Sequence, residues 1–281
     1  MPAIGIDLVA AVCQAKGVDS EERAYLAGHR SHDPACLMRR WRSVAGKANL
    51  RIVDLEAETS HPVVALSNRH PVPGAGLYLS AGIHGDEPAA VWGLLKWAEE
   101  NVHFLRERSV FILPCLNPWG LRNNRREDAE GRDLNRCFDH PEVPVIGAIL
   151  ELISVRNFTF AVSLHEDFDA NGLYLYELAR QGESLGSDLL QQAEEIIPRH
   201  QGRVDGRAPR DGVLRRTRGL TGAVHEIGGM PESIYLFLNG ARSALTFETP
   251  SEYSLYRRVQ CHLRFLEGVV SLAGSGNGGS C

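Results

Sequence analysis

Two histidines and a glutamate in the sequence have the types and the spacing of a metal site. His84 and Glu87 stand three residues apart, where an apolar run at 76–83 gives way to a helical pattern. Imidazole and carboxylate are donors of catalytic zinc, which takes three protein ligands and keeps one position open. His165, at the end of a second apolar run at 158–165, is the natural third ligand. This donor set favours zinc over magnesium or calcium, which prefer oxygen ligands.

A further carboxylate lies at the end of a third apolar run. Glu248 falls within residues 243–249, and a glutamate is rarely buried without a partner. At a strand end beside a metal, its carboxylate could act as a general base. We therefore treat Glu248 as a candidate catalytic residue.

An arginine-rich stretch follows the sequence Asn117-Pro118-Trp119-Gly120. A cluster of guanidinium groups beside a metal would suit a substrate carboxylate and a developing oxyanion. The same stretch could instead be a solvated loop, because its acidic residues nearly balance its arginines. The arginines are Arg122, Arg125, Arg126, Arg132 and Arg136.

The elements that must position these residues alternate along the chain. Strands are expected at 51–57, 62–68, 76–83, 109–116, 158–165, 172–178 and 243–249, and helices at 37–48, 87–101, 145–155, 185–201 and 253–272. Strands alternating with helices predict an α/β protein, a three-layer α/β/α arrangement with a central mixed, mostly parallel sheet. In such sheets sites gather at the carboxyl ends of strands, where the candidate residues fall.

The domain organisation is predicted to be simple. Residues 1–273 are expected to form a single catalytic domain that begins with a helical segment, 1–48, and residues 274–281 a flexible tail. Residues 202–222 form a long, basic loop, a kind of segment that is often functional. The loop is either a solvated surface or a rim that draws an anionic substrate to the metal.

Composition excludes several classes of protein. The formal net charge of −5 over 281 residues argues against a nucleic-acid partner. The six cysteines form no C-x-x-C pair, which fits a reducing compartment. The first residues lack a basic segment typical of a signal peptide, and no apolar run reaches the ~20 residues of a membrane helix. We expect a cytoplasmic protein with no membrane partner, and the oligomeric state stays open.

The motifs, in chain order, are H-x-x-E, N-P-x-G, G-x-D-L-N-R, S-L-H and T-F-E. Together they resemble the zinc carboxypeptidase superfamily, which includes the succinylglutamate desuccinylase and aspartoacylase branch. The resemblance covers residues 76–250 and implies a zinc-carboxypeptidase-like fold. It also implies one Zn²⁺ ion per chain, held by His84, Glu87 and His165, with Glu248 as the catalytic glutamate.

The same resemblance implies roles for the arginine-rich stretch. Asn135 and Arg136 match the pair that binds the terminal carboxylate of a substrate. Arg126, by its spacing before Asn135, matches the arginine that polarises the scissile carbonyl, and Arg122 and Arg125 are neighbours that could be confused with it.

Two features depart from the pattern of the digestive carboxypeptidases. No tyrosine is clearly placed to match their mobile residue that caps the substrate, and Tyr235 is the candidate. The acidic run of Glu166, Asp167 and Asp169 has no counterpart in the motif. It could support His165 from behind, or it could complement a basic substrate.

Three functions follow as hypotheses. The first is a zinc metallohydrolase of the carboxypeptidase type, which cleaves a small peptide or amino-acid derivative with a free carboxylate. The second is a deacylase that releases an amino acid from an N-acyl amino acid, as in the desuccinylase and aspartoacylase branch. The third is a catalytically inactive binding module, although the complete set of ligands, base and arginines argues against it.

Overall fold

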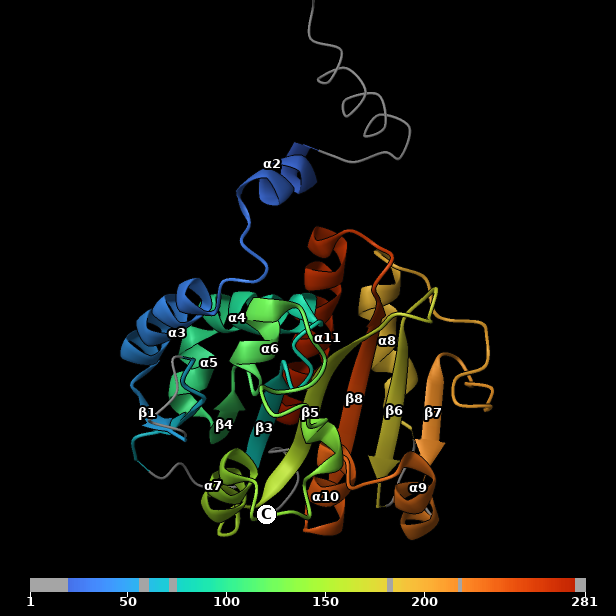
Figure 1. Ribbon diagram of the computed structural model, residues 1–281. Helices are drawn as coiled ribbons and strands as arrows, with labels where there is room; N and C mark the ends of the chain where they lie inside the picture. Colours follow the sequence, from blue (N-terminus) through green and yellow to red (C-terminus); the bar gives the residue numbers. More distant parts are fainter. Residues whose placement is uncertain (1–19, 56–60, 71–74, 181–183, 217–218, 276–281) are drawn as a thin grey trace, which may run out of the picture.

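The computed structural model describes residues 20–55, 61–70, 75–180, 184–216 and 219–275. The strands within these ranges form a single sheet (Figure 1). Its strand order is β1-β2-β4-β3-β5-β8-β6-β7. The strands are β1 Leu50–Asp54, β2 Val64–Asn68, β3 Gly76–Ala81, β4 Val110–Leu113, β5 Phe158–Asp167, β6 Tyr174–Ala179, β7 Val213–Arg216 and β8 Ser243–Pro250.

The middle of the sheet is parallel, and an antiparallel pair borders it on each side. Strands β4, β3, β5 and β8 pair in parallel, whereas β1, β2 and β4 pair antiparallel with one another in turn. On the other side, β6 runs antiparallel to β8 and parallel to β7. The predicted mixed, mostly parallel sheet is confirmed, and β5 and β8 lie side by side in its parallel part (Figure 1).

Helices cover both faces of the sheet. They are α2 Ser20–Gly28, α3 Pro34–Ala48, α4 Pro88–Glu100, α5 Val102–Glu107, α6 Pro118–Asn123, α7 Pro144–Ile153, α8 Gly186–Glu194, α9 Leu220–Ile227, α10 Glu232–Leu238 and α11 Leu255–Ser275, with a short 3₁₀ helix η1 at Leu134–Arg136. Helices α3, α4, α8 and α11 pack on one face, and α7, α9 and α10 pack on the other.

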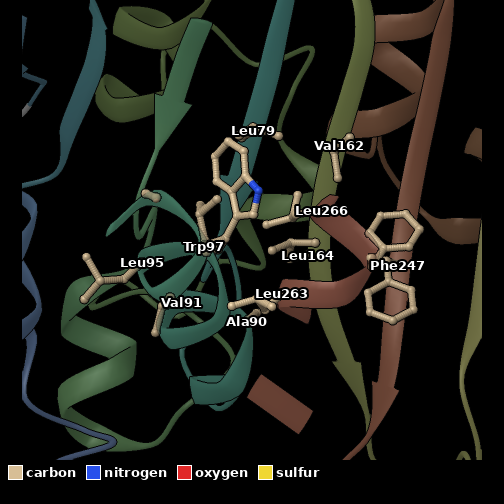
Figure 2. Close-up of a cluster of buried hydrophobic side chains, with 14 of the residues drawn as sticks. Leu79, Ala90, Val91, Leu95, Trp97, Val162, Leu164, Phe247, Leu263 and Leu266 are labelled. Atoms are coloured by element: carbon tan, nitrogen blue, oxygen red, sulfur yellow. The ribbon is translucent and has the colours of Figure 1, made fainter. Parts of the chain in front are cut away.

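Alternation along the central strands sorts most of the core into two large clusters, one on each face of the sheet, and a small third cluster lies around Tyr174 and Leu214. Leu77 and Leu79 of β3 face the α4 and α11 side, whereas Tyr78 between them faces α7 and α10. Figure 2 shows the first cluster, where Trp97 of α4 packs with Leu79 and Leu266. Because both faces of these strands are buried, their sequences are almost continuously apolar, as predicted.

Several elements differ from the expected ranges. Helix α8 ends at Glu194 rather than 201, since Pro198 lacks the N–H that a continuing helix would need. Helix α11 runs to Ser275, into the predicted tail, while 276–281 lie outside the described residues. The expected helical start holds α2 and α3, and residues 1–19 lie outside the described part as well.

The basic segment 202–222 is not a continuous loop. It contains β7 and the first residues of α9, which the sequence analysis missed because β7 is short and ends in two arginines. Helix α10 was also missed, since its β-branched and aromatic residues favour a strand.

No helix in the described ranges is both long and apolar enough to cross a membrane. The four cysteines that lie in those ranges are Cys36, Cys115, Cys137 and Cys261, and all four are free thiols.

Candidate active site

The turn between β3 and α4 presents two of the candidate ligands. His84 lies three residues beyond the end of β3, and Glu87 is the N-cap residue of α4. An N-cap side chain ordinarily accepts a hydrogen bond from the first turn of its helix, but the Glu87 carboxylate makes none. It turns instead toward the histidines. Glu87 Oε1 lies 2.6 Å from His84 Nδ1, and Oε2 lies 3.0 Å from His165 Nδ1.

The three side chains form a buried group that fits a zinc ion. His165 comes from β5, and its ring centroid lies 5.0 Å from that of His84. The ligand atoms of His84, Glu87 and His165 all lie within 4.8 Å of one another, and all three residues are buried. Glu87 Oε2 is buried and makes no hydrogen bond of good geometry. Two imidazoles and a carboxylate with an unsatisfied oxygen match the donors of zinc.

Charges within the group shift the pKa values of its members. Burial lowers the pKa of His84, but the carboxylates of Glu87 and Asp133 outweigh it and raise this pKa to about 9. The pKa of His165 is also raised, because Glu87 and Glu248 outweigh burial. Burial would raise the pKa of Glu87, yet the two histidines lower it to about 2. The raised pKa values favour protonated histidines, and the lowered pKa of Glu87 favours its carboxylate, so the charges within the group compensate each other. A metal ion would compete with protons for the imidazole nitrogens.

Asp133 supports both His84 and Arg126. Its Oδ1 lies 3.2 Å from His84 Nε2, and its Oδ2 accepts hydrogen bonds from Arg126 Nε and Nη2 at 3.2 and 3.0 Å. The hydrogen bond with His84 and nearby positive charges outweigh burial, so the pKa of Asp133 lies well below its usual range. Carboxylates that bind the far nitrogen of a ligand histidine fix its orientation. The sequence analysis counted Asp133 only as a balancing charge, although its place in G-x-D-L-N-R was the available signal.

Arg126 lies beside the metal group. Its Nη1 is 3.3 Å from His84 Nδ1 and 3.9 Å from Glu87 Oε1. Its guanidinium therefore lies where an oxyanion developing next to the metal could be stabilised.

The N-P-x-G motif explains how Arg126 reaches this place. Asn117 caps α6 by accepting the N–H of Gly120, and its Nδ2 donates to the carbonyls of Arg126 and Glu127. A Cβ on Gly85 would lie 2.0 Å from the carbonyl carbon of Gly120. The turn that carries His84 thus packs backbone against backbone on the start of α6.

Glu248 stands directly across from His165. The two residues are register partners on β8 and β5. Glu248 is buried and lines the main cavity. Burial raises the pKa of its carboxyl to about 8; His165 opposes this shift and Glu87 adds to it. A carboxyl with a pKa near neutrality suits a group that takes and gives protons.

Asn135 and Arg136 line the same cavity from η1. Asn135 Oδ1 accepts the backbone N–H of Glu232 at 2.9 Å, which leaves its amide nitrogen as the atom that could donate to a ligand. Arg136 donates from Nη1 to its neighbour's carbonyl and from Nε to the carbonyl of Ile227. Both side chains are held by backbone groups at the cavity wall.

Tyr235 is not among the residues that line the cavity. It lies on α10, and its ring packs toward that of Phe138, 6.1 Å away, in the second core cluster. The tyrosines that line the cavity are Tyr174 and Tyr176 of β6. Tyr174 is the register partner of Glu248 and donates to Asp167 at 2.7 Å. These tyrosines were missed because only the pairing of β6 with β8 brings them to the site.

The cavity has a volume of about 940 Å³ and extends from the metal group along the sheet to β7 and α9. Arg203, Arg207 and Arg216 of the basic segment also line the cavity. Arg215 lies on the opposite face of β7, with Nε 4.0 Å from Glu177. A second cavity of about 630 Å³ lies on the other side of Glu87, which lines both.

The three residues of the acidic run all line both cavities, but each has different partners. Glu166 is buried and bonds to α4 and α11, and Asp167 accepts the Tyr174 hydroxyl. Asp169 donates its backbone N–H to Asp167 and lies at the surface between the two cavities.

One known protein family matches part of the sequence. Residues 73–143 match the family described as the succinylglutamate desuccinylase/aspartoacylase catalytic domain. The matched segment contains His84, Glu87 and Arg126, but ends before His165 and Glu248. No curated protein matches the sequence.

Solved structures share the fold. A candidate metallopeptidase from Shewanella amazonensis superposes with a TM-score of 0.75 at 21% identity, over 86% of this chain and 94% of the other. A metallo-carboxypeptidase from Burkholderia cenocepacia gives 0.61 at 16%, over 84% and 68%. A metallo-carboxypeptidase from Pseudomonas aeruginosa, in complex with (2-guanidinoethylmercapto)succinic acid, gives 0.57 at 17%, also over 84% and 68%.

The fold is therefore that of the metallocarboxypeptidases, and the resemblance to the zinc carboxypeptidase superfamily is confirmed. Within that superfamily, the matched segment is similar to the desuccinylase and aspartoacylase catalytic domain.

Proposed function

We propose that the protein is a zinc-dependent hydrolase of amide bonds that acts on a small peptide or amino-acid derivative with a free carboxylate. The buried group of His84, Glu87 and His165 carries this proposal, because its three ligand atoms converge within 4.8 Å beside Glu248 and Arg126. A bound zinc ion supplies Lewis acidity that activates water and polarises a carbonyl.

The chain's own residues supply the remaining chemistry. Glu248 takes a proton from the attacking water and passes it to the leaving amine, a role that suits its raised pKa. Arg126 donates hydrogen bonds to the carbonyl oxygen as negative charge develops on it. Asn135 and Arg136 hold the free carboxylate of the substrate at the cavity wall, so that the amide lies next to Glu248.

A second candidate is an N-acyl amino acid deacylase. The match of residues 73–143 to the desuccinylase/aspartoacylase catalytic domain favours it. The two activities differ in the acyl side of the amide, which is an aminoacyl group in a peptide and a simple acyl group in the deacylase substrate. The complex of the Pseudomonas enzyme with a succinic acid derivative supports small carboxylates as ligands in either case.

The test combines metal analysis with paired substrates. Purified protein is stripped of metal with a chelator, reloaded with zinc and assayed for bound metal, alongside His84→Ala. We expect one zinc per chain in the wild type and a loss of metal in the variant, because one of three ligands is missing. The loaded enzyme is then offered dipeptides, the same dipeptides amidated at the C-terminus, and N-acetyl and N-succinyl amino acids.

Hydrolysis of dipeptides but not of their amides supports the carboxypeptidase activity. Hydrolysis confined to N-acyl amino acids replaces it with the deacylase. A wild-type protein that takes up no zinc overturns the metal centre. A protein that binds zinc but cleaves neither substrate class is the inactive binding module.

A further inference from the structure

Glu166 is a buried carboxylate next to the metal group that the proposed reaction does not use. It follows His165 on β5, and its side chain is wholly inaccessible to solvent. Its Oε1 accepts the backbone N–H of Ala89 at 2.5 Å, and its Oε2 accepts a hydrogen bond from Arg258 of α11. One side chain thus links three elements, β5, α4 and α11.

The start of α4 explains why such a residue is needed. The first N–H groups of a helix have no partner within the helix, and the N-cap side chain normally satisfies one of them. Glu87 is the N-cap, but its carboxylate faces the two histidines and makes no capping bond. Pro88 has no N–H, so Ala89 carries the first donor that requires a partner.

Glu166 replaces the missing cap from a neighbouring strand. Its carboxylate accepts the Ala89 N–H, so Glu87 can point toward the metal position while its helix end stays satisfied. Because Glu166 directly follows His165, the same bond fixes the distance between the strand of one ligand and the helix of another. Arg258 compensates the charge of Glu166, since a buried carboxylate without a partner would be costly.

We propose that Glu166 is a positioning residue of the metal centre, which caps α4 in place of Glu87 and thereby holds Glu87 and His165 at ligand distance. Glu166 lines both cavities, but its two carboxylate oxygens are bonded to Ala89 and Arg258, so it acts through the backbone of both ligand segments. The proposal rests on the metal centre of the proposed function.

The chain contains a matched control in Glu177 on β6. Glu177 is also fully buried, accepts the backbone N–H of Leu185 at the start of α8 at 2.9 Å, and accepts the hydroxyl of Ser184. Its Oε2 also lies 4.0 Å from an arginine, Arg215. In both places a glutamate on a strand accepts a backbone N–H at the start of a helix. No candidate metal ligand belongs to α8 or β6, however.

The experiment compares Glu166→Ala and Glu166→Gln with Glu177→Ala and Glu177→Gln in the full chain. Zinc affinity is measured by competition with a chelating indicator, stability by denaturant unfolding of the metal-free protein, and ligand geometry by the visible spectrum of the Co²⁺-loaded protein. We expect Glu166→Ala to weaken zinc binding about 10- to 100-fold and to change the Co²⁺ spectrum. Glu166→Gln keeps an oxygen for the Ala89 N–H, so its affinity should lie closer to the wild type.

The Glu177 variants should lose comparable stability and bind zinc as the wild type does. Unchanged zinc affinity in Glu166→Ala, or an equal loss in Glu177→Ala, overturns the positioning role. If either alanine variant does not fold, Glu166→Asp and Glu177→Asp decide in the same way, because the shorter side chain draws the carboxylate back from the helix start: zinc affinity should fall at 166 and stay unchanged at 177. A wild type that binds no zinc overturns the proposed function itself, which separates that failure from this one.

Discussion

At the scale of single residues, the pairing of His165 with Glu248 determines what the site can do. The two side chains come from adjacent parallel strands and lie opposite each other in register. Glu248 therefore lies next to a candidate metal ligand, and its burial raises the pKa of its carboxyl to about 8. Under the proposed function, a carboxyl in this position acts as the base and exchanges protons with a substrate held at Asn135 and Arg136.

Glu248→Gln tests this separation of roles. The change keeps the shape of the side chain and removes its ability to accept a proton, so we expect zinc to remain stoichiometric while kcat falls by ~10²–10⁴. Metal analysis and steady-state kinetics on the same preparation provide the measurement. A variant that retains most of the wild-type kcat would rule out Glu248 as the base.

At the scale of elements, the alternation of side chains along β7 determines which of its two arginines faces the cavity. Side chains alternate along a strand, so Leu214 and Arg216 line the cavity while Arg215 turns toward Glu177. The expected rim for an anionic substrate thus consists of part of the segment. The arginines of the segment that line the cavity are Arg203, Arg207 and Arg216.

Arg216→Gln should lower kcat/KM for substrates with an anionic side chain more than for neutral ones. An ion pair at a partly exposed position contributes about 0.2–1 kcal/mol, which corresponds to at most about a fivefold loss. The salt dependence of kcat/KM should weaken as well. Arg210→Gln is the control, since Arg210 is exposed in the same segment and does not line the cavity. If Arg216→Gln and Arg210→Gln changed kcat/KM equally, the basic segment would be a solvated surface with no role in attracting the substrate.

The same elements show how far the sequence could predict the site. His84, Glu87, Asn135 and Arg136 belong to short motifs, so local spacing is sufficient to find them. Tyr174 could not be found this way, because its place beside Glu248 depends on the antiparallel pairing of β6 with β8. The strands β4, β3, β5 and β8 were predicted because burial on both faces leaves an apolar run. Strand β7 has one face toward an open cavity and leaves no such signal.

At the scale of the whole molecule, the layer behind the site is held by a close contact between α4 and α11. His262 of α11 is fully buried, and a Cβ on Gly93 of α4 would lie 2.4 Å from the His262 Cβ. Its Nε2 lies 3.2 Å from the Thr249 hydroxyl. Burial lowers the pKa of His262 from 6.5 to about 3, with Arg258 adding to the effect, so the ring is neutral in the folded protein.

This neutral histidine predicts loss of stability in acid. Between pH 6.5 and about 3 the unfolded chain binds a proton at His262 that the folded chain does not. The free energy of unfolding should therefore fall as pH falls through that window, by at most ~1.4 kcal/mol per pH unit from this residue. Above pH 6.5 the residue should contribute no pH dependence.

The contribution is measured as the difference between wild type and His262→Gln in denaturant unfolding at a series of pH values. His103→Gln, at an exposed histidine of α5, is the control. The difference in the free energy of unfolding between wild type and His262→Gln should become smaller in acid, since the variant has no histidine at this position to take up a proton on unfolding. A difference that stays constant from pH 7 to pH 4 would contradict the prediction.

The backbone contact between Gly85 and Gly120 has a consequence for how a site built in this way could come to accept new substrates. No side chain intervenes between the turn that carries His84 and the helix start that places Arg126, so repacking cannot change their spacing. The opposite end of the cavity is built by β7 and α9, near the margin of the sheet and remote from this contact. Substitutions there can alter substrate preference while the catalytic geometry is inherited unchanged.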